Sequence, residues 1–311
     1  MRMKQIKNTL LLASLLLAGC TAEETPEVDN GITPVPPVEL TTPLEIESAS
    51  LEAEVTTRAT TTLGSGNSIG VFLSGTGYTD RNNCYYAYYS SSSWLPYDGS
   101  HTIYLGGASA SVCAYHPWTS GNNNKTAIPL TSQIYSGDKD ISFATNRTLA
   151  GNSTNKSTSF AMTRAYGMLN IKLIKSSDYP GTCSVTKLEF QNLLKTANLN
   201  IATGVYSAGR GISGTTFSET KTVTPTTSGT SWGDFLLVPC IPYNDSMKIV
   251  LTVDGKTMTT TIASTSYHPG KGEYKQITLT IKGTSLGVTS VTTTDWPAAS
   301  DGGSYVPTPS Y

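Results

Sequence analysis

The sequence predicts an all-β fold with two tandem β-sandwich domains. Charged residues make up only 14% of the 311 residues and hydrophobic residues 38%. Ser, Thr, Gly and Asn dominate the remainder, a composition that suits short strands and turns. Apolar residues recur in short segments bounded by turn residues, and no segment keeps a helical period. The length is sufficient for two domains, each with its own core.

Residues 1–20 have the features of a secretory signal. A basic start is followed by an apolar run from Leu10 to Leu17 and by small residues before Cys20. The segment is too short to span a membrane. Leu17-Ala18-Gly19-Cys20 resembles the bacterial lipobox, in which the Cys becomes the lipidated first residue; the alternative is an ordinary signal with an incidental Cys. Because Thr21 replaces the Asp often linked to inner-membrane retention, we expect an outer-membrane lipoprotein held by several acyl chains.

Residues 21–58 form an acidic segment that we interpret as a removable propeptide. Residues 21–57 contain nine acidic residues and no basic residue. The chain after position 58 has 17 basic and 13 acidic residues, a net charge of +4. Such block asymmetry is typical of tails and removable segments. The positive charge of the body is spread without any basic run, so no nucleic-acid partner is expected.

The propeptide divides into a tether and an amphipathic strand. Three prolines between positions 34 and 37 keep the tether, residues 21–43, extended. Apolar residues then alternate with polar ones at Leu44, Ile46, Leu51, Ala53 and Val55. This period of two predicts a strand over 44–55. Cleavage after Arg58, at the Arg58-Ala59 bond, would remove that strand.

The body after Arg58 contains a long series of strand candidates. In the first half they lie at 69–73, 84–89, 94–97, 102–105, 112–116, 127–130 and 140–144. In the second half they lie at 168–174, 185–190, 199–201, 235–239, 248–253, 258–262, 277–281 and 288–296. Asp254-Gly255 is typical of a hairpin turn. The polar stretch 148–159 is the favoured boundary between domains at 59–150 and 159–311, and 177–181 is the competing boundary.

Several motifs of the body follow one another in an order that resembles a known family. They are Gly66-Asn-Ser-Ile-Gly-Val-Phe72, His101-Thr-Ile-Tyr-Leu105, Val112-Cys-Ala-Tyr-His-Pro117, Asp140-Ile-Ser-Phe-Ala144, Leu237-Val-Pro239, Asp254-Gly-Lys256 and Gly270-Lys-Gly-Glu-Tyr274 through Trp296. Over residues 44–303 the chain resembles the fimbrillins, the subunits of type V pili of anaerobic Gram-negative bacteria. Phe160-Ala-Met162 departs from the Phe-x-His pattern common in that family.

The resemblance implies two transthyretin-like Greek-key sandwiches, a lipidated precursor and proteolysis after an Arg near the start of the mature chain. Its functional positions transfer to Cys20, as the lipidation site, and to Arg58-Ala59, as the cut for a trypsin-like processing protease. The expected destination is the outer membrane for the precursor and the cell surface or fimbrium after processing.

A removable strand would explain how subunits join. Without residues 44–55, an apolar groove would be flanked by unpaired backbone groups. A strand of another subunit could then complete the sheet by donor-strand complementation. Burial of several hundred Å² of apolar surface would contribute on the order of 10 kcal/mol. The favoured donor is the C-terminal region, where 288–296 has good β propensity, whereas Pro307 and Pro309 disfavour the last residues.

No pattern in the sequence indicates catalysis. Gly-x-Ser-x-Gly occurs at 66–70 and 229–233, but both copies lie in polar loops that lead into strands, not in the strand–turn–helix context of a nucleophile elbow. His101, His116 and His268 lack ligand spacing, and no Cys-x-x-Cys is present. Neither an enzymatic activity nor a metal or cofactor is therefore expected.

Four cysteines remain after Cys20. Secretion permits disulfides. Among the three possible pairings, Cys84–Cys113 with Cys183–Cys240 keeps each bridge within one predicted domain. The alternative is that these residues are buried free thiols, which are common in β cores. The sequence leaves both interpretations open.

The densest aromatic cluster is Cys84-Tyr-Tyr-Ala-Tyr-Tyr89 with Trp94 and Tyr97. Exposed aromatic rings can stack on sugars. Period two separates Tyr85 and Tyr89 from Tyr86 and Tyr88, so part of the run is expected in the core or at a subunit interface.

The leading hypothesis is a structural pilus subunit with a role in adhesion. Its partners would be other pilus subunits and a host glycan or protein receptor. The alternative is a monomeric outer-membrane lipoprotein that binds glycan.

Overall fold

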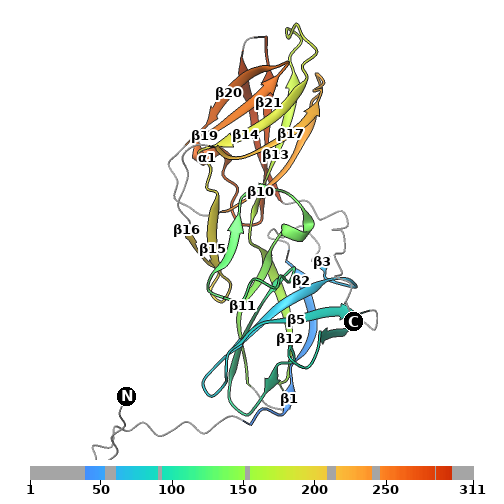
Figure 1. The fold of residues 1–311 in the computed structure, drawn as a ribbon, viewed down its shortest axis with the longest axis vertical. Helices are drawn as coiled ribbons and strands as arrows, with labels where there is room; N and C mark the ends of the chain where they lie inside the picture. The colour runs from blue at the N-terminus through green and yellow to red at the C-terminus, as the bar shows by residue number, and fades with distance from the viewer. Residues whose placement is uncertain are drawn as a thin grey trace, which may run out of the picture. The chain divides into compact units, whose positions relative to one another are not determined.

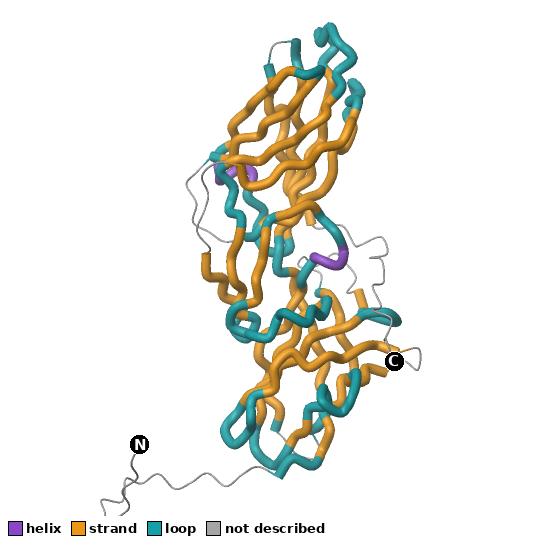
Figure 2. The backbone as a smooth tube through the Cα atoms, viewed as in Figure 1, coloured by secondary structure: helices purple, strands orange, loops and turns teal. Residues whose placement is uncertain are grey.

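The computed structural model shows an all-β fold, as the composition predicts (Figure 1). It describes residues 39–52, 61–89, 93–150, 155–208, 215–239, 246–283 and 285–295. Helical structure in these ranges is limited to a 3-10 turn, η1 (Gly137–Lys139), and one short helix, α1 (Ser264–Tyr267), as Figure 2 shows. Within the described ranges, no helix has both the length and the apolar character needed to cross a membrane.

Most strands of the first half form one eight-stranded sheet in the spatial order β12-β11-β8-β4-β5-β6-β2-β3. Because β12 also pairs with β2, the strands from β2 to β12 close into a ring. The strands of this sheet are β2 (Glu45–Leu51), β3 (Thr61–Thr62), β4 (Ser68–Ser74), β5 (Arg81–Tyr89), β6 (Ser93–Pro96), β8 (Ala110–His116), β11 (Ser142–Leu149) and β12 (Ser157–Arg164), of which β3 lies outside the ring. Strands β1 (Thr42–Pro43) and β7 (Tyr104–Leu105) form a separate two-stranded sheet, and Leu105 packs in the same core as the ring.

A hydrophobic core fills the inside of the ring. Ile69 and Val71 of β4 and Tyr86 of β5 are fully buried in it. The Tyr86 hydroxyl accepts a hydrogen bond from the Ile103 N–H at 3.2 Å, which satisfies this buried polar group. The ring is therefore a packed core and not an open channel.

The second half forms a β-sandwich of two sheets. The five-stranded sheet has the order β10-β18-β13-β21-β22 and the four-stranded sheet the order β17-β14-β19-β20. The strands are β10 (Gln133–Ile134), β13 (Gly167–Lys175), β14 (Val185–Gln191), β17 (Thr215–Val223), β18 (Thr230–Leu237), β19 (Met247–Val253), β20 (Lys256–Ile262), β21 (Glu273–Ile281) and β22 (Leu286–Asp295). Ile171, Phe190 and Ile249 are fully buried members of the shared core.

The hairpin predicted at Asp254-Gly255 is confirmed. These residues connect β19 to β20, and both have positive φ, 46° and 76°. Two successive residues with positive φ are typical of the tight turn that fits the twist of paired strands.

The two halves also share structure. A three-stranded sheet contains β9 (Ile128–Thr131), β15 (Thr196–Asn200) and β16 (Val205–Ala208), and β10 pairs with β18. A third core cluster includes Phe72 from the first half and Leu236 from the second. The division into domains at 59–150 and 159–311 stays a prediction, although β12 begins inside the stretch assigned as a boundary and belongs to the first sheet.

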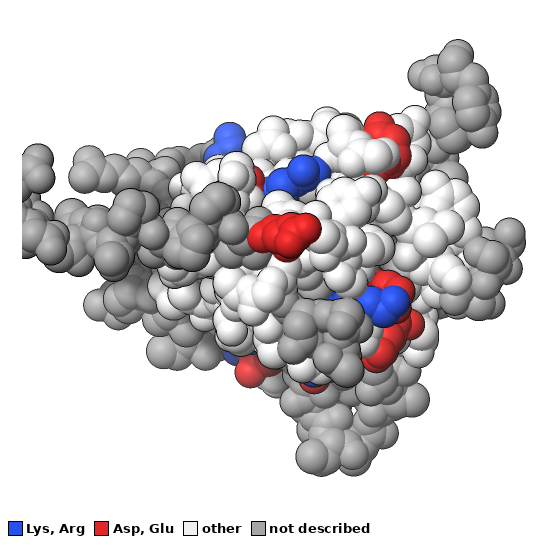
Figure 3. Space-filling view, turned by 90° about the horizontal axis from the view of Figure 1, so that it is seen from below, with Lys and Arg blue, Asp and Glu red and all other residues white. Residues whose placement is uncertain are grey.

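Charged side chains are sparse on the face shown in Figure 3. Blue and red residues are scattered among uncharged ones, and no large basic area appears on this face.

Candidate assembly site

The strand β2 lies where the sequence predicts an amphipathic strand. Ile46 and Ala49 are 6% and 0% exposed, and Leu44, just before the strand, is 4% exposed. Glu45 and Glu47 point away from the core and are exposed. The inward residues 46 and 49 are three positions apart because a register shift occurs where β2 faces Thr158 and Ser159. An extra residue at such a bulge restores the inward direction of the following side chains.

Strand β2 closes the ring between β12 and β6, and it has many more register pairs with β12 than with β6. Six residues of β2 pair in parallel with β12, from Glu45 opposite Ser157 to Leu51 opposite Met162. On the other side a single register pair, Ile46 with Trp94, joins β2 to β6. The ring is therefore held firmly at β12 and weakly at β6.

Main-chain hydrogen bonds continue the attachment beyond both ends of β2. The Leu44 N–H donates to the Ile103 carbonyl, the Glu45 N–H to the Lys156 carbonyl and the Glu52 N–H to the Met162 carbonyl, each at 2.8 Å. Buried backbone groups need such partners. Loss of the segment would therefore leave a row of unpaired groups on β12.

The outward carboxylates of β2 also contact β12. Glu47 accepts hydrogen bonds from Ser157 Oγ at 2.6 Å and Ser159 Oγ at 3.3 Å. Lys156 Nζ lies 2.5 Å from Glu45 Oε1, with both side chains well exposed. Exposed pairs of this kind contribute little to stability, on the order of 0–1 kcal/mol. The buried face, rather than these contacts, carries most of the attachment.

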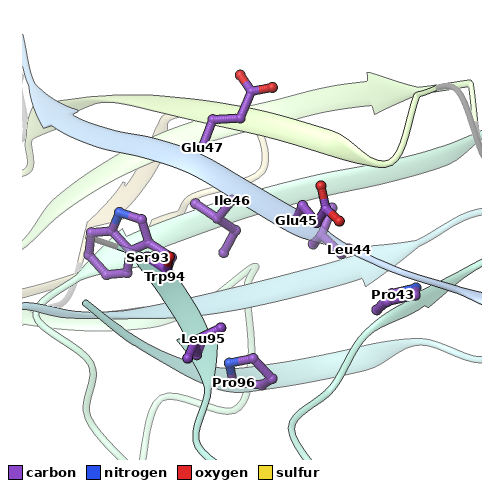
Figure 4. A pocket seen from close by; sticks show the side chains of 9 residues that line it. All are labelled: Pro43, Leu44, Glu45, Ile46, Glu47, Ser93, Trp94, Leu95 and Pro96. Atoms are coloured by element: carbon purple, nitrogen blue, oxygen red, sulfur yellow. The ribbon is translucent and has the colours of Figure 1, made fainter. Parts of the chain in front are cut away.

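A shallow cleft of about 510 Å³ follows the weak seam between β2 and β6. Figure 4 shows its lining, in which Leu44, Ile46 and Trp94 lie close together along the two strands. The remaining lining residues are Pro43, Glu45, Glu47, Ser93, Leu95 and Pro96. The cleft therefore marks the seam at which β2 and β6 share a single register pair.

The predicted cleavage site lies in the connection after this strand. Arg58 and Ala59 fall in residues 53–60, outside the described residues, as does the lipidation site Cys20. The strands on either side of the connection are paired, Ser50 with Thr62 and Leu51 with Thr61. A cut after Arg58 would therefore separate β2 from the body covalently while its pairing with β12 and β3 still held it in place.

Of the two interpretations that the sequence leaves open for Cys84 and Cys113, a disulfide or buried free thiols, the structure has the free thiols. Strand β4 lies between their strands, with Cys84 opposite Val71 and Cys113 opposite Phe72. Consecutive residues of a strand point to opposite faces, and two strand spacings amount to about 9–10 Å. A disulfide needs Cα atoms within about 7 Å. Cys183 is also a buried free thiol, so the alternative of free thiols describes it as well; Cys240, its partner in the other interpretation, lies outside the described residues.

Thiol labelling tests whether Cys84 and Cys113 are free. Burial raises the pKa of Cys84 and raises that of Cys113 to about 12, so both stay protonated at pH 8. In the folded protein we expect neither to react with iodoacetamide. In guanidinium without reductant both should become labelled, as peptide mapping by mass spectrometry would show. If the two residues become labelled only after prior reduction, they form a disulfide.

The aromatic run divides between the core and the surface, as its period predicts. Tyr86 is fully buried, whereas the Tyr89 side chain is 41% exposed. Tyr85 lies under a group of surface rings, with Tyr97, His101 and Trp118 at centroid distances of 5.3, 6.3 and 4.5 Å. Tyr97 is 45% exposed, but Trp94 is only 4% exposed and faces the core. Trp94 therefore cannot contact a glycan, and Tyr97 can.

Each Gly-x-Ser-x-Gly motif begins in a loop, as predicted, but its serine already belongs to the following strand. Ser68 is the first residue of β4, and Ser231 lies in β18. No helix follows either strand directly within the described part of the chain. The histidines are dispersed: the His116 ring bonds to the Ser68 carbonyl, and the His101 ring accepts from the Tyr85 N–H. In the described residues, no three His, Cys, Asp or Glu side chains gather at one point.

The fold and site together define an all-β protein whose first sheet is closed by a strand that precedes a predicted cut. The family model described as fimbrillin-like matches residues 57–296. This range is more than half of the chain, so the chain belongs to the fimbrillin-like family. A search of curated proteins finds no match.

Solved structures share this fold at low sequence identity. A candidate cell adhesion protein from Bacteroides ovatus has a TM-score of 0.60 and 19% identity, over 84% of this chain and 100% of that one. One from Bacteroides uniformis has a TM-score of 0.57 and 19% identity, over 82% and 98%. One from Parabacteroides distasonis has a TM-score of 0.50 and 9% identity, over 81% and 97%. These similarities concern the fold.

Proposed function

We propose that the chain is a structural subunit of a cell-surface pilus with a role in adhesion. It is exported as a precursor anchored in the outer membrane through lipid on Cys20, and a trypsin-like protease cleaves it after Arg58. Family membership supports this proposal. The observation that carries it is the position of β2, which closes the first sheet although it precedes the predicted cut. The family match begins at residue 57 and so excludes β2.

Removal of β2 would prepare the subunit for donor-strand complementation. Strand β12 would keep only two register pairs with β11, Ser142 with Arg164 and Phe143 with Thr163. The apolar positions that Leu44, Ile46 and Ala49 fill would be open to solvent. A strand of another subunit would restore both the backbone pairing and the burial.

The C-terminal donor predicted from the sequence is already paired in the structure. Strand β22 pairs with β21 over nine positions, from Leu286 opposite Ile281 to Asp295 opposite Glu273. Leu286 is 7% exposed, and Val291 packs against the second core. Donation of β22 would therefore require it to leave its own sheet.

Mutation of the cleavage site tests the proposal. Treatment of the precursor with limiting trypsin should cut after Arg58 and yield detergent-resistant, heat-sensitive ladders when cognate subunits are present. The Arg58→Gln variant should stay uncut and monomeric, whereas Lys256→Gln, a change at an exposed hairpin residue, should behave like the wild type. Ladders from Arg58→Gln equal to those of the wild type, or cleaved protein that joins no cognate subunit, would reject the proposal.

The exposed ring group around Tyr97 favours a second candidate function, glycan binding by a monomeric surface lipoprotein. Tyr97 and Trp118 flank Tyr85 and present aromatic faces of the kind that stack on sugars. Glycan arrays with the wild type and Tyr97→Ala test it. Specific hits that disappear in the variant, together with cleavage that produces no assembly, would favour this function over the pilus subunit.

A further inference from the structure

Three residues on neighbouring strands form a row across the inner face of the first sheet. Ile46 of β2 is paired with Trp94 of β6 on one side and with Thr158 of β12 on the other. Their exposed fractions are 4% for Trp94, 6% for Ile46 and 2% for Thr158. The row therefore lies inside the ring, at the centre of the segment that cleavage would release.

The two outer members of this row carry polar atoms that β2 leaves unpaired. Among the described residues, neither Trp94 Nε1 nor Thr158 Oγ1 has a hydrogen-bond partner. Buried polar groups normally have one, because a group that loses water without a replacement is costly. The only side chain between these two atoms along the row is Ile46, which can neither donate nor accept.

On the outer face of the same strands, the polar side chains of β2 and β12 are paired with each other. There Glu47 accepts hydrogen bonds from Ser157 and Ser159, the two residues on either side of Thr158. Strand β2 thus matches β12 on the solvent side and fails to match it on the core side. The mismatch is confined to the position of Ile46.

We propose that the strand that replaces β2 in the assembled form carries a hydroxyl or amide side chain at the position of Ile46. Apolar side chains would occupy the positions of Leu44 and Ala49. This inference rests on the proposed function, because it describes the partner that the emptied groove accepts.

The geometry of the sheet supports this chemistry. Neighbouring strands of a sheet lie about 4.7–4.9 Å apart, so side chains at paired positions on one face are neighbours on both sides of β2. A hydroxyl in the middle of the row can therefore accept a hydrogen bond from Trp94 Nε1 and share another with Thr158 Oγ1, which can donate or accept. Exchange of β2 for such a strand would replace two unpaired groups by paired ones. Strand β2 still closes the intact precursor, but a donor strand with the polar side chain binds the same groove more favourably than β2 does.

A pair of isosteric variants in the full-length, uncut chain tests the polar character of the row. Val and Thr have nearly the same shape, but a hydroxyl buried in an apolar core is unfavourable. We expect Ile46→Thr to be at least as stable to urea as Ile46→Val. At Leu44, a position in the apolar core, Thr should be less stable than Val. The folding equilibrium constant of Leu44→Thr should be roughly fivefold or more below that of Leu44→Val. If Ile46→Thr is less stable than Ile46→Val by as much as Leu44→Thr is less stable than Leu44→Val, the inference is overturned.

Strand exchange tests the partner itself. Protein cleaved after Arg58 would be incubated with synthetic peptides of residues 41–54 that carry Val or Thr at position 46. The Thr peptide should displace β2 at a concentration about fivefold lower, as one added hydrogen bond implies, and Thr158→Val should reduce this preference. Binding of both peptides without a preference for Thr would reject the inference alone. If neither peptide binds, no added strand can replace β2 in the cleaved protein, and both the proposed function and the inference are rejected.

Discussion

A chain that begins at Ala59, and therefore lacks β2, is expected to unfold at a temperature roughly 10 °C or more below that of the full-length protein. The deletion removes Leu44, Ile46 and Ala49 from the first core and unpairs the inner edge of β12. Burial of a Leu or Ile side chain contributes about 1.5–3 kcal/mol, so about 5 kcal/mol is lost in total. Calorimetry of both chains under the same conditions measures the difference.

Addition of the missing strand in trans should reverse this loss. A synthetic peptide of residues 41–54 fills the groove and should raise the unfolding temperature with a concentration dependence typical of ligand binding. A control peptide with Ser at the positions of Leu44 and Ile46 keeps the backbone and the charges but lacks the buried groups, and should have no effect. Equal unfolding temperatures for the two chains, or equal recovery with both peptides, would show that β2 does not close the core.

The variant Arg164→Met should lower the free energy of unfolding by about 3–5 kcal/mol, as expected when a buried ion pair loses one partner. Arg164, the last residue of β12, forms an ion pair with Asp140 just after η1. The two side chains are only 11% and 6% exposed. Among the described residues, Asp140 Oδ1 has no hydrogen-bond partner, so the carboxylate depends on the guanidinium.

Urea unfolding of a double-mutant cycle measures this effect. The variant Asp140→Asn removes the charge that Arg164→Met would strand, so the double variant should recover part of the stability lost by Arg164→Met alone. Purely additive losses would mean that the pair contributes no coupling. Because the pair holds the end of β12 against the following loop, its loss should also weaken the strand on which β2 depends.

Patterns of apolar alternation and turn residues predict much of this fold. Segment 248–253 is a strand whose buried residues alternate with partly exposed ones, at the period of a pleated sheet. Segments 69–73 and 84–89 are strands with continuous buried runs, bounded by turn residues. Asp254-Gly255 predicts its hairpin because few residues adopt positive φ. The amphipathic strand before the predicted cut is confirmed over Glu45–Leu51, because its inward residues find a core to cover.

Other features depend on contacts that local patterns do not encode. Strand β12 has only Phe160 and Met162 as large apolar residues, so the surrounding Ser and Thr residues suggest a linker. Its pairing with β2, which lies about a hundred positions away in the chain, makes it a strand. Likewise, the faces of Cys84 and Cys113 depend on the register of β4 between them, and register is a tertiary property.

The most direct test of the removable strand is the intact mass of the subunits in assembled material from the cell surface. Donor-strand assembly predicts chains that begin at Ala59 and lack residues 39–52. Polymers whose subunits retain Glu45–Leu51 would contradict it, because the groove on β12 would then still be occupied by the subunit's own strand.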